Sequence, residues 1–257
     1  YDDITADDCY KLSPYGKVFQ KLYQFSKTHS NVGITYTPFA VLLDQFHGMD
    51  RQPAGQQVFG KFGYNQGDME TFNLIETLWP QTFSVEKNGN FWLAEDINAV
   101  GKKGWDAACE RVATWAILKD KNTGKKFFFL NTHLDHMGKV ARHEGASLVL
   151  EQAKKLSENL PIIVTGDFNA VPSDEPIQVL TNPSDPRHLT HSRTIAGFTY
   201  GPEWTFHDFG KIPYDKREWI DYIFVKGNIK VLRHGVLTET LNNLFPSDHC
   251  PVISTLI

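Results

Sequence analysis

Four apolar runs of strand length each border a short polar cluster, and this pattern constrains the fold more than any other feature of the chain. The clusters occupy residues 131–136, 166–169, 220–222 and 247–249, with the sequences NTHLDH, GDFN, IDY and SDH. Strand ends in an α/β layer commonly meet at one rim, where sites form. Four clusters at one rim would place several carboxylates, two or three imidazoles and an amide in one cleft.

Hydrophobic patterning after about residue 83 predicts more strands than helices. One predicted helix, over residues 139–159, connects two of the predicted strands. The predicted strands cover residues 91–93, 111–119, 126–132, 162–165, 219–225, 229–237 and 251–256. This order predicts an α/β fold of the layered sandwich type.

The first 82 residues have a different character. The pattern predicts a helix over 15–29, an apolar segment over 34–43 that Pro38 interrupts, and a short helix over 69–78. We therefore expect two units: an atypical N-terminal segment, 1–82, which could be a fused helix–strand unit, and an α/β domain over 83–257.

Composition excludes several classes of protein. With 257 residues, 41% of them hydrophobic and 13% aromatic, the chain can bury a core and is not disordered. No apolar run reaches the roughly 18 residues of a membrane helix. The formal net charge of -4 does not favour a nucleic-acid partner, although nucleic acid stays open as a substrate. Three cysteines cannot all pair within one chain.

The clusters fit metal-assisted hydrolysis of a phosphate ester. Carboxylates such as Asp248 suit Mg²⁺ or Mn²⁺, which prefer oxygen ligands. A histidine held by an aspartate can act as a base toward water, and an amide can donate to phosphate oxygens. Each cluster alone has a simpler explanation, because GDFN could be only a turn and a single histidine is more often structural. His136 and His143 are expected to be helix-start and surface residues.

Taken together and in this order, the motifs resemble the endonuclease/exonuclease/phosphatase family, whose fold is DNase I-like. The resemblance covers about residues 83–257, and residues 1–80 do not match it. It is carried by NTHLDH (131–136), GDFNA (166–170), IDYIFV (220–225) and SDHCPV (247–252), and GNFWL (89–93) and GWDAACERVATW (104–115) are similar to a bacterial branch of the family.

The resemblance implies a role for each matching residue. His133 and Asn169 would contact the phosphate, Asp167 would orient or activate the water, and His249 would be the general base. Asp221 would orient His249, and Asp248 would bind the metal. Arg111 is a weaker candidate for phosphate contact, and a surface charge at a strand end explains it equally well.

The chain departs from the family in its N-terminal third. The family has an asparagine on its first strand and a metal-binding glutamate in a Gln-Glu pair, and neither motif is found at the expected distance. Asp68, Glu76 or Glu95 would have to replace that glutamate. The alternative is therefore a non-catalytic binding module on the same scaffold that has lost this metal ligand.

Two further expectations, on a carbohydrate-linked role and on location, rest on fewer sequence features. A carbohydrate-linked role ranks third, suggested by the N-terminal third and by four tryptophans, Trp79, Trp92, Trp105 and Trp204, which core packing also explains. The chain begins at Tyr1 rather than Met and has no signal-peptide pattern, so we expect either a mature product or a piece of a longer chain, and a secreted or periplasmic bacterial protein is compatible with both.

Overall fold

The structure is a computed structural model that describes residues 83–238, 240, 245 and 247–257. The predicted segment 1–82, with its two helices and its apolar segment, lies outside the described residues. In the described part, strands and helices alternate from β3 to β6, and a run of three consecutive strands stands at each end.

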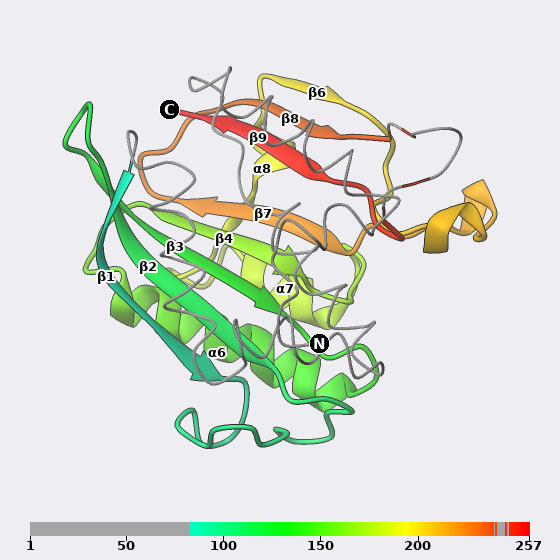
Figure 1. The fold of residues 1–257 in the computed structure, drawn as a ribbon, viewed down its shortest axis with the longest axis horizontal. Helices are drawn as coiled ribbons and strands as arrows, with labels where there is room; N and C mark the ends of the chain where they lie inside the picture. Colours follow the sequence, from blue (N-terminus) through cyan, green and yellow to red (C-terminus); the bar gives the residue numbers. More distant parts are fainter. Residues whose placement is uncertain (1–82, 239, 241–244, 246) are drawn as a thin grey trace, which may run out of the picture.

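A six-stranded sheet forms the centre of the described part, in the order β1-β2-β3-β4-β7-β5 (Figure 1). Neighbouring strands are antiparallel except for β3 and β4, which are parallel. A parallel pair needs a long crossover, and helix α6 (Lys139–Leu156) supplies it. The strands are β1 (Phe83–Trp92), β2 (Val112–Asp120), β3 (Lys126–His133), β4 (Ile162–Asp167), β5 (Thr190–His191) and β7 (Asp221–Lys226).

A second, three-stranded sheet has the order β6-β8-β9 and lies beyond β7 in Figure 1. Helices α6 and α7 run along one face of the larger sheet. The remaining elements are β6 (Phe198–Tyr200), β8 (Val231–Val236), β9 (Val252–Leu256), α7 (Glu175–Thr181), α8 (Ser192–Ile195) and two 3₁₀ turns, Asp208–Gly210 and Tyr214–Lys216. This mixed α/β arrangement confirms the predicted fold class.

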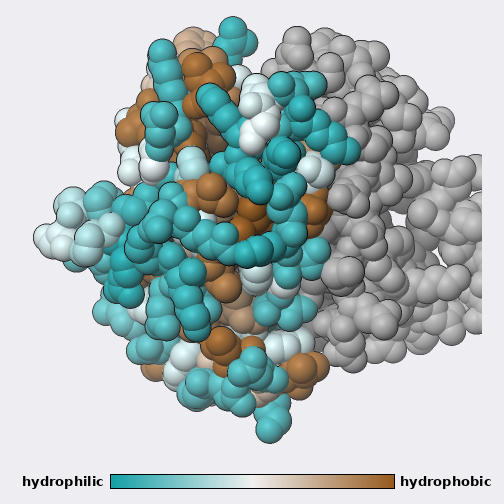
Figure 2. Space-filling model, turned by 90° about the vertical axis from the view of Figure 1, so that its left-hand side faces the viewer, coloured by the Kyte–Doolittle hydropathy of each residue, from teal (hydrophilic) through white to brown (hydrophobic). Residues whose placement is uncertain are grey.

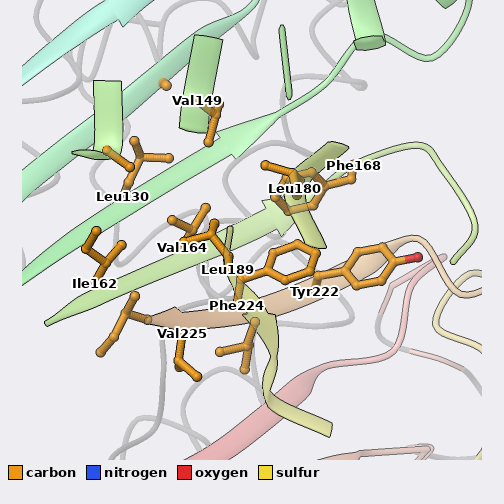
Figure 3. Packing of buried hydrophobic residues seen from close by; sticks show 14 of the residues in the cluster. Leu130, Val149, Ile162, Val164, Phe168, Leu180, Leu189, Tyr222, Phe224 and Val225 are labelled. Atoms are coloured by element: carbon orange, nitrogen blue, oxygen red, sulfur yellow. The ribbon is translucent and has the colours of Figure 1, made fainter. Parts of the chain in front are cut away.

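The core continues to the ends of the strands that carry the polar clusters. Every residue of β4 is buried, as expected for a strand that is covered on both faces. Phe168, directly after β4, meets the rings of Tyr222 and Phe224 edge-on, with centroids 5.6 and 5.2 Å apart (Figure 3). Because packed aromatic rings surround the first residues after β4, the backbone that presents Asp167 and Asn169 is held firmly.

The face of the described part that Figure 2 shows is ordinary for a globular protein. On the face shown in Figure 2, hydrophilic residues predominate and hydrophobic ones lie in small separate areas. Among the described residues, no helix combines the length and the apolar character that crossing a membrane requires.

Several element boundaries differ from the sequence-based expectation. Strand β1 begins at Phe83 rather than at residue 91, because pairing with β2 extends through the polar stretch that contains Asn88 and Gly89. Strand β7 begins at Asp221 rather than at Trp219. Helix α6 ends at Leu156, three residues before its predicted end.

Candidate active site

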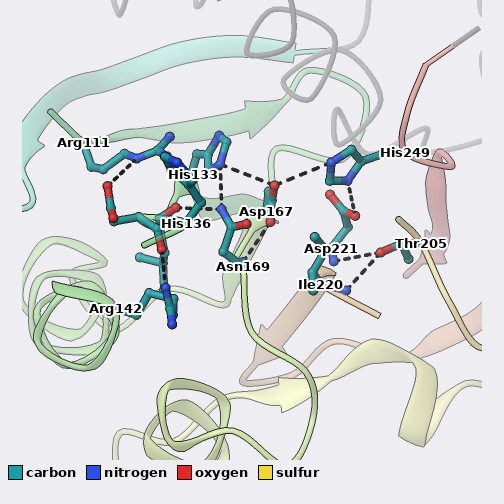
Figure 4. A network of polar contacts seen from close by, with 12 residues as sticks. Arg111, His133, His136, Arg142, Asp167, Asn169, Thr205, Ile220, Asp221 and His249 are labelled. Carbon is teal, nitrogen blue, oxygen red and sulfur yellow. Dashed lines mark hydrogen bonds and ion pairs between the residues drawn. The ribbon is translucent and has the colours of Figure 1, made fainter. Parts of the chain in front are cut away.

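The register of three neighbouring strands brings three of the predicted site residues side by side. His133 at the end of β3 pairs with Asp167 at the end of β4, and Asp167 pairs in turn with Asp221 at the start of β7. Strand β7 is antiparallel to β4, so its first residue lies where β4 ends. The polar clusters therefore meet at one end of the sheet, as the sequence predicted (Figure 4).

His249 reaches this end of the sheet from the segment before β9. Its Nδ1 atom lies 2.8 Å from Oδ2 of Asp221, and both side chains are buried. The hydroxyl oxygen of Thr205 accepts hydrogen bonds from the backbone N–H groups of Ile220 (3.0 Å) and Asp221 (3.1 Å). These bonds hold the start of β7, and so they fix the carboxylate that orients the imidazole of His249.

Asp167 lies between the two histidines of the site. Its Oδ2 atom is 3.4 Å from Nε2 of His133 and 3.9 Å from Nε2 of His249. Its Oδ1 atom accepts a hydrogen bond from the backbone N–H of Asn169 at 2.8 Å. Asp167, Asp221 and His249 form a buried group in which one ligand atom from each residue lies within 4.8 Å of the others, as a metal site requires.

Burial and neighbouring charges shift the pKa values of Asp167, His249 and His133 in different directions. Burial, together with the charge of Asp221, raises the pKa of Asp167 to about 7. Burial alone would lower the pKa of His249, but the charge and hydrogen bond of Asp221 outweigh it and raise that pKa to about 9. Burial and the charge of His249 lower the pKa of His133 to about 3, so His133 is neutral near pH 7.

The amide of Asn169 bridges the loops that follow β3 and β4. Its Nδ2 atom donates to the backbone carbonyl of Leu134 at 2.9 Å and lies 2.9 Å from Nε2 of His133. Asn169 adopts a left-handed backbone conformation with φ of 46°, which asparagine tolerates better than most residues. An amide nitrogen has two hydrogens, so a phosphate oxygen would have to replace one of these two partners.

Arg111 and Asp248, the other two predicted site residues, lie beside this group. Arg111 directly precedes β2, and its guanidinium contacts Asp135 and His136. The backbone carbonyl of Asp248 accepts from the N–H groups of His207 (2.9 Å) and Asp208 (3.1 Å). The negative charge of Asp248 contributes to the raised pKa of His249.

The predicted substitutes for the family's missing glutamate gain no support from the described residues. Glu95 is exposed, and its carboxylate accepts a hydrogen bond from the backbone N–H of Trp105 at 3.1 Å. Asp68 and Glu76 lie outside the described part of the chain. Within that part, the buried group of possible metal ligands at this rim consists of Asp167, Asp221 and His249.

Sequence reasoning missed two residues that organise the site. Thr205 carries the backbone bonds at the start of β7, but a threonine in a loop gives no periodic signal. Asp135 accepts four backbone hydrogen bonds beside His133, a role that its membership of the NTHLDH motif does not by itself indicate. The signal for Asp135 was available, because it lies between two histidines of a polar cluster.

Comparison with known proteins gives one family. A sequence model of the Endonuclease/Exonuclease/phosphatase family matches residues 39–249 and so includes residues 39–80, to which the motif resemblance does not extend. A curated relative, Protein angel of Drosophila melanogaster, is 28% identical over 110 residues, which are 38% of this chain and 31% of that protein. The match thus covers about a third of this curated relative.

Solved structures with similar folds include proteins of the same family. An endonuclease/exonuclease/phosphatase from Bacteroides vulgatus is 38% identical with a TM-score of 0.65, over 68% of this chain and 66% of its own. A mannosyl-6-phosphatase from Bacteroides thetaiotaomicron is 37% identical with a TM-score of 0.63, over 68% and 67% of the two chains. A protein of unknown function from Enterococcus faecalis is 31% identical with a TM-score of 0.62, over 69% and 68%.

Proposed function

Because this chain belongs to the endonuclease/exonuclease/phosphatase family, we propose that it is a metal-dependent phosphoesterase that hydrolyses a phosphomonoester or a phosphodiester. One observation carries the proposal: Nδ1 of His249 is bound to the buried carboxylate of Asp221, while its Nε2 faces Asp167. A buried histidine that a carboxylate holds on one side and that faces a reaction site on the other is typical of a general base.

The buried carboxylates fit a divalent cation. Asp167 and Asp221 offer oxygen ligands, and Oδ1 of Asp221 has no hydrogen-bond partner among the described residues. Mg²⁺ and Mn²⁺ prefer such oxygens, and Asp248 is the further carboxylate that we propose as a ligand. When bound, the cation would neutralise phosphate charge and favour the neutral form of His249.

The side chains of the site then have separate tasks. His249 accepts a proton from water at Nε2, and Asp221 holds the hydrogen on Nδ1 and stabilises the imidazolium that forms. Asp167, 3.9 Å from that Nε2, accepts a hydrogen bond from the same water and orients it. The N–H groups of His133, Asn169 and Arg111 donate to the phosphate oxygens and stabilise the charge of the transition state.

A sugar phosphate is the first substrate to test. The support comes from the mannosyl-6-phosphatase of Bacteroides thetaiotaomicron, which is 37% identical over 68% of this chain. The formal net charge of -4 gives no electrostatic preference for nucleic acid. We therefore expect hydrolysis of mannose 6-phosphate to exceed hydrolysis of single-stranded DNA.

The test measures hydrolysis of mannose 6-phosphate, p-nitrophenyl phosphate and bis-p-nitrophenyl phosphate by protein stripped of metal and then supplied with Mg²⁺ or Mn²⁺. Activity should require the cation, and His249→Ala should lower kcat by about 10²- to 10⁴-fold. His143→Ala serves as the matched control, because His143 lies on α6 and contacts Glu175 rather than the site. Equal rates for His249→Ala and the wild type would contradict the proposal.

The alternative, a non-catalytic module, predicts a different result. It would show no hydrolysis with either cation. Calorimetric titration with Mn²⁺ adds a second criterion, since only the enzyme hypothesis expects saturable binding that Asp248→Ala weakens. Circular dichroism of each variant confirms that loss of activity or binding does not come from unfolding.

A further inference from the structure

Asp135 lies next to the candidate active site and binds two loops at once. Its Oδ1 atom accepts from the backbone N–H groups of Met137 (2.9 Å) and Gly138 (2.7 Å), and its Oδ2 atom accepts from those of Ala108 (3.1 Å) and Cys109 (3.0 Å). Its side chain is only 1% exposed. A buried carboxylate with four N–H donors stays ionised and rigid, so it is a fixed negative charge at the end of β3.

Arg111 is held against this charge. Its Nε atom lies 3.5 Å from Oδ2 of Asp135, and its side chain is 12% exposed. Its Nη2 atom lies 3.1 Å from Nδ1 of His136. A guanidinium can only donate, so Nδ1 of His136 accepts and the neutral imidazole carries its hydrogen on Nε2. Two neighbouring side chains thus hold the guanidinium, one by an ion pair at Nε and the other by a hydrogen bond at Nη2.

The β2–β3 register places this guanidinium beside the phosphate-contact residues. Ala113 pairs with Thr132, so Arg111, two residues before Ala113, lies opposite the loop that follows His133. The backbone of Arg111 is fixed as well, because its carbonyl accepts from the N–H of Leu93 at 2.8 Å. Figure 4 shows Arg111 and His133 at the same end of the polar network, with His136 between Arg111 and Asn169.

A metal ion is the competing ligand for this cluster. Cys109, Asp135 and His136 each offer an atom within 4.8 Å of the others, which is close enough for shared coordination. However, both oxygens of Asp135 already accept two N–H groups each, and a permanent positive charge contacts His136. A cation would have to displace these donors from Asp135 and His136, whereas an anion would meet the N–H donors of Arg111 and His136.

We infer that Asp135 and His136 are positioning residues that hold the Arg111 guanidinium for contact with the substrate phosphate. The inference rests on the phosphoesterase function proposed above and adds two residues to which no role has been assigned. Arg111 makes the contact with the anion. Asp135 and His136 act through Arg111, because Asp135 forms an ion pair with its Nε atom and His136 accepts from its Nη2 atom.

The first experiment measures the binding of inorganic phosphate by calorimetry and its inhibition constant against p-nitrophenyl phosphate. Arg111→Ala should weaken phosphate binding by about 10- to 100-fold, the range for a charge-assisted hydrogen bond. His136→Ala should raise KM and the phosphate inhibition constant by about three- to tenfold and change kcat little. His143→Ala, a histidine on α6 away from Arg111, should change neither.

The decisive measurement is the double variant. If His136 acts through Arg111, adding His136→Ala to Arg111→Ala should weaken phosphate binding by less than about twofold more. A full and independent effect of His136→Ala in that background would overturn the inference, and so would unchanged phosphate binding in either single variant. A merely structural role for His136 would lower stability without this dependence on Arg111.

Asp135→Asn tests the second positioning residue. Asparagine has the same shape, but its NH₂ group would face backbone N–H donors, so we expect weaker phosphate binding together with lower thermal stability. The His136→Ala series decides the inference even if this variant unfolds. If the wild type binds phosphate through Arg111 but hydrolyses no ester, the proposed function fails and the positioning of Arg111 stands.

Discussion

The hydroxyl of Tyr222 donates a hydrogen bond to the backbone carbonyl of Ala170 at 2.9 Å and so joins β7 to the loop that carries Asn169. The same hydroxyl lies 3.1 Å from the carbonyl oxygen of Trp219. Tyr222 is completely buried. One side chain next to Asp221 therefore fixes the position of the amide that we propose as a phosphate contact.

Tyr222→Phe tests this link. The phenylalanine ring keeps the edge-on contact with Phe168 but leaves the two carbonyls of Ala170 and Trp219 buried without this donor. We expect the free energy of unfolding in urea to fall by about 1–3 kcal/mol. We also expect kcat/KM to fall several-fold, because the loop of Asn169 gains freedom. Unchanged stability and unchanged kcat/KM would show that the hydrogen bond does not hold the loop.

Because Gly166 has no side chain, strands β3 and β4 can approach each other closely next to the site. Its φ is 152°, and a Cβ atom placed on it would lie 1.9 Å from the carbonyl oxygen of Thr132. Backbone atoms of a central strand pair cannot move aside without shifting Asp167, the next residue. Glycine at this position is therefore a requirement of the site as well as of the sheet.

Gly166→Ala should consequently destabilise the protein by about 3 kcal/mol or more and reduce activity. Gly124→Ala is the matched control: Gly124 also has positive φ, 72°, but an added Cβ would meet nothing within 4 Å. That variant should lose only the roughly 1–2 kcal/mol of left-handed backbone strain. Denaturant unfolding of the two variants measures the difference, and equal losses would mean that steric contact with Thr132 is unimportant.

Much of the fold can be predicted from the sequence, because long helices and strands have a periodic pattern of apolar residues. Helix α6 and strands β2, β3 and β4 were predicted within a few residues, since each combines a clear apolar pattern with enough length. Elements of two to four residues, such as β5, α8 and β6, are too short to show a period. Strand β1 was predicted too short because its polar residues become a strand only through pairing with β2.

In the candidate site, too, some residues are predictable from a local sequence pattern and others are not. His133, Asp167, Asp221 and His249 were predicted to converge because each borders a strand-sized apolar run, and the structure places them together. Thr205 accepts hydrogen bonds from backbone N–H groups 15 and 16 residues further along the chain, and no local pattern reveals this pairing. Asp135 is different, because its place between two histidines of the NTHLDH motif is a signal that the sequence itself offers. The contact of Arg111 with His136 depends on how two loops meet, which the sequence alone does not specify.

A second pair of histidines, the buried His234 and the half-buried His191, lies away from the candidate site. The ring centroids of His191 and His234 are 5.5 Å apart, and Nδ1 of His234 lies 2.8 Å from the hydroxyl of Ser192 and 3.0 Å from that of Ser254. Burial, with the positive charge of Arg193, lowers the pKa of His234 to about 4. Burial and the charges of His234 and Arg193 lower the pKa of His191 to about 3.

This pair should make the fold sensitive to acid. Above about pH 7.5 both histidines are almost entirely neutral in the folded and unfolded chains and contribute little to pH dependence. As the pH falls from 6.5 toward 4, the unfolded chain binds protons that the folded chain does not, so each histidine lowers stability by up to about 1.4 kcal/mol per pH unit. His234→Asn keeps a polar group near Ser192 but cannot titrate in this range. Urea unfolding between pH 6.5 and 4.5 should therefore show a shallower decline for His234→Asn than for the wild type, whereas parallel declines would mean that His234 is protonated in the folded protein.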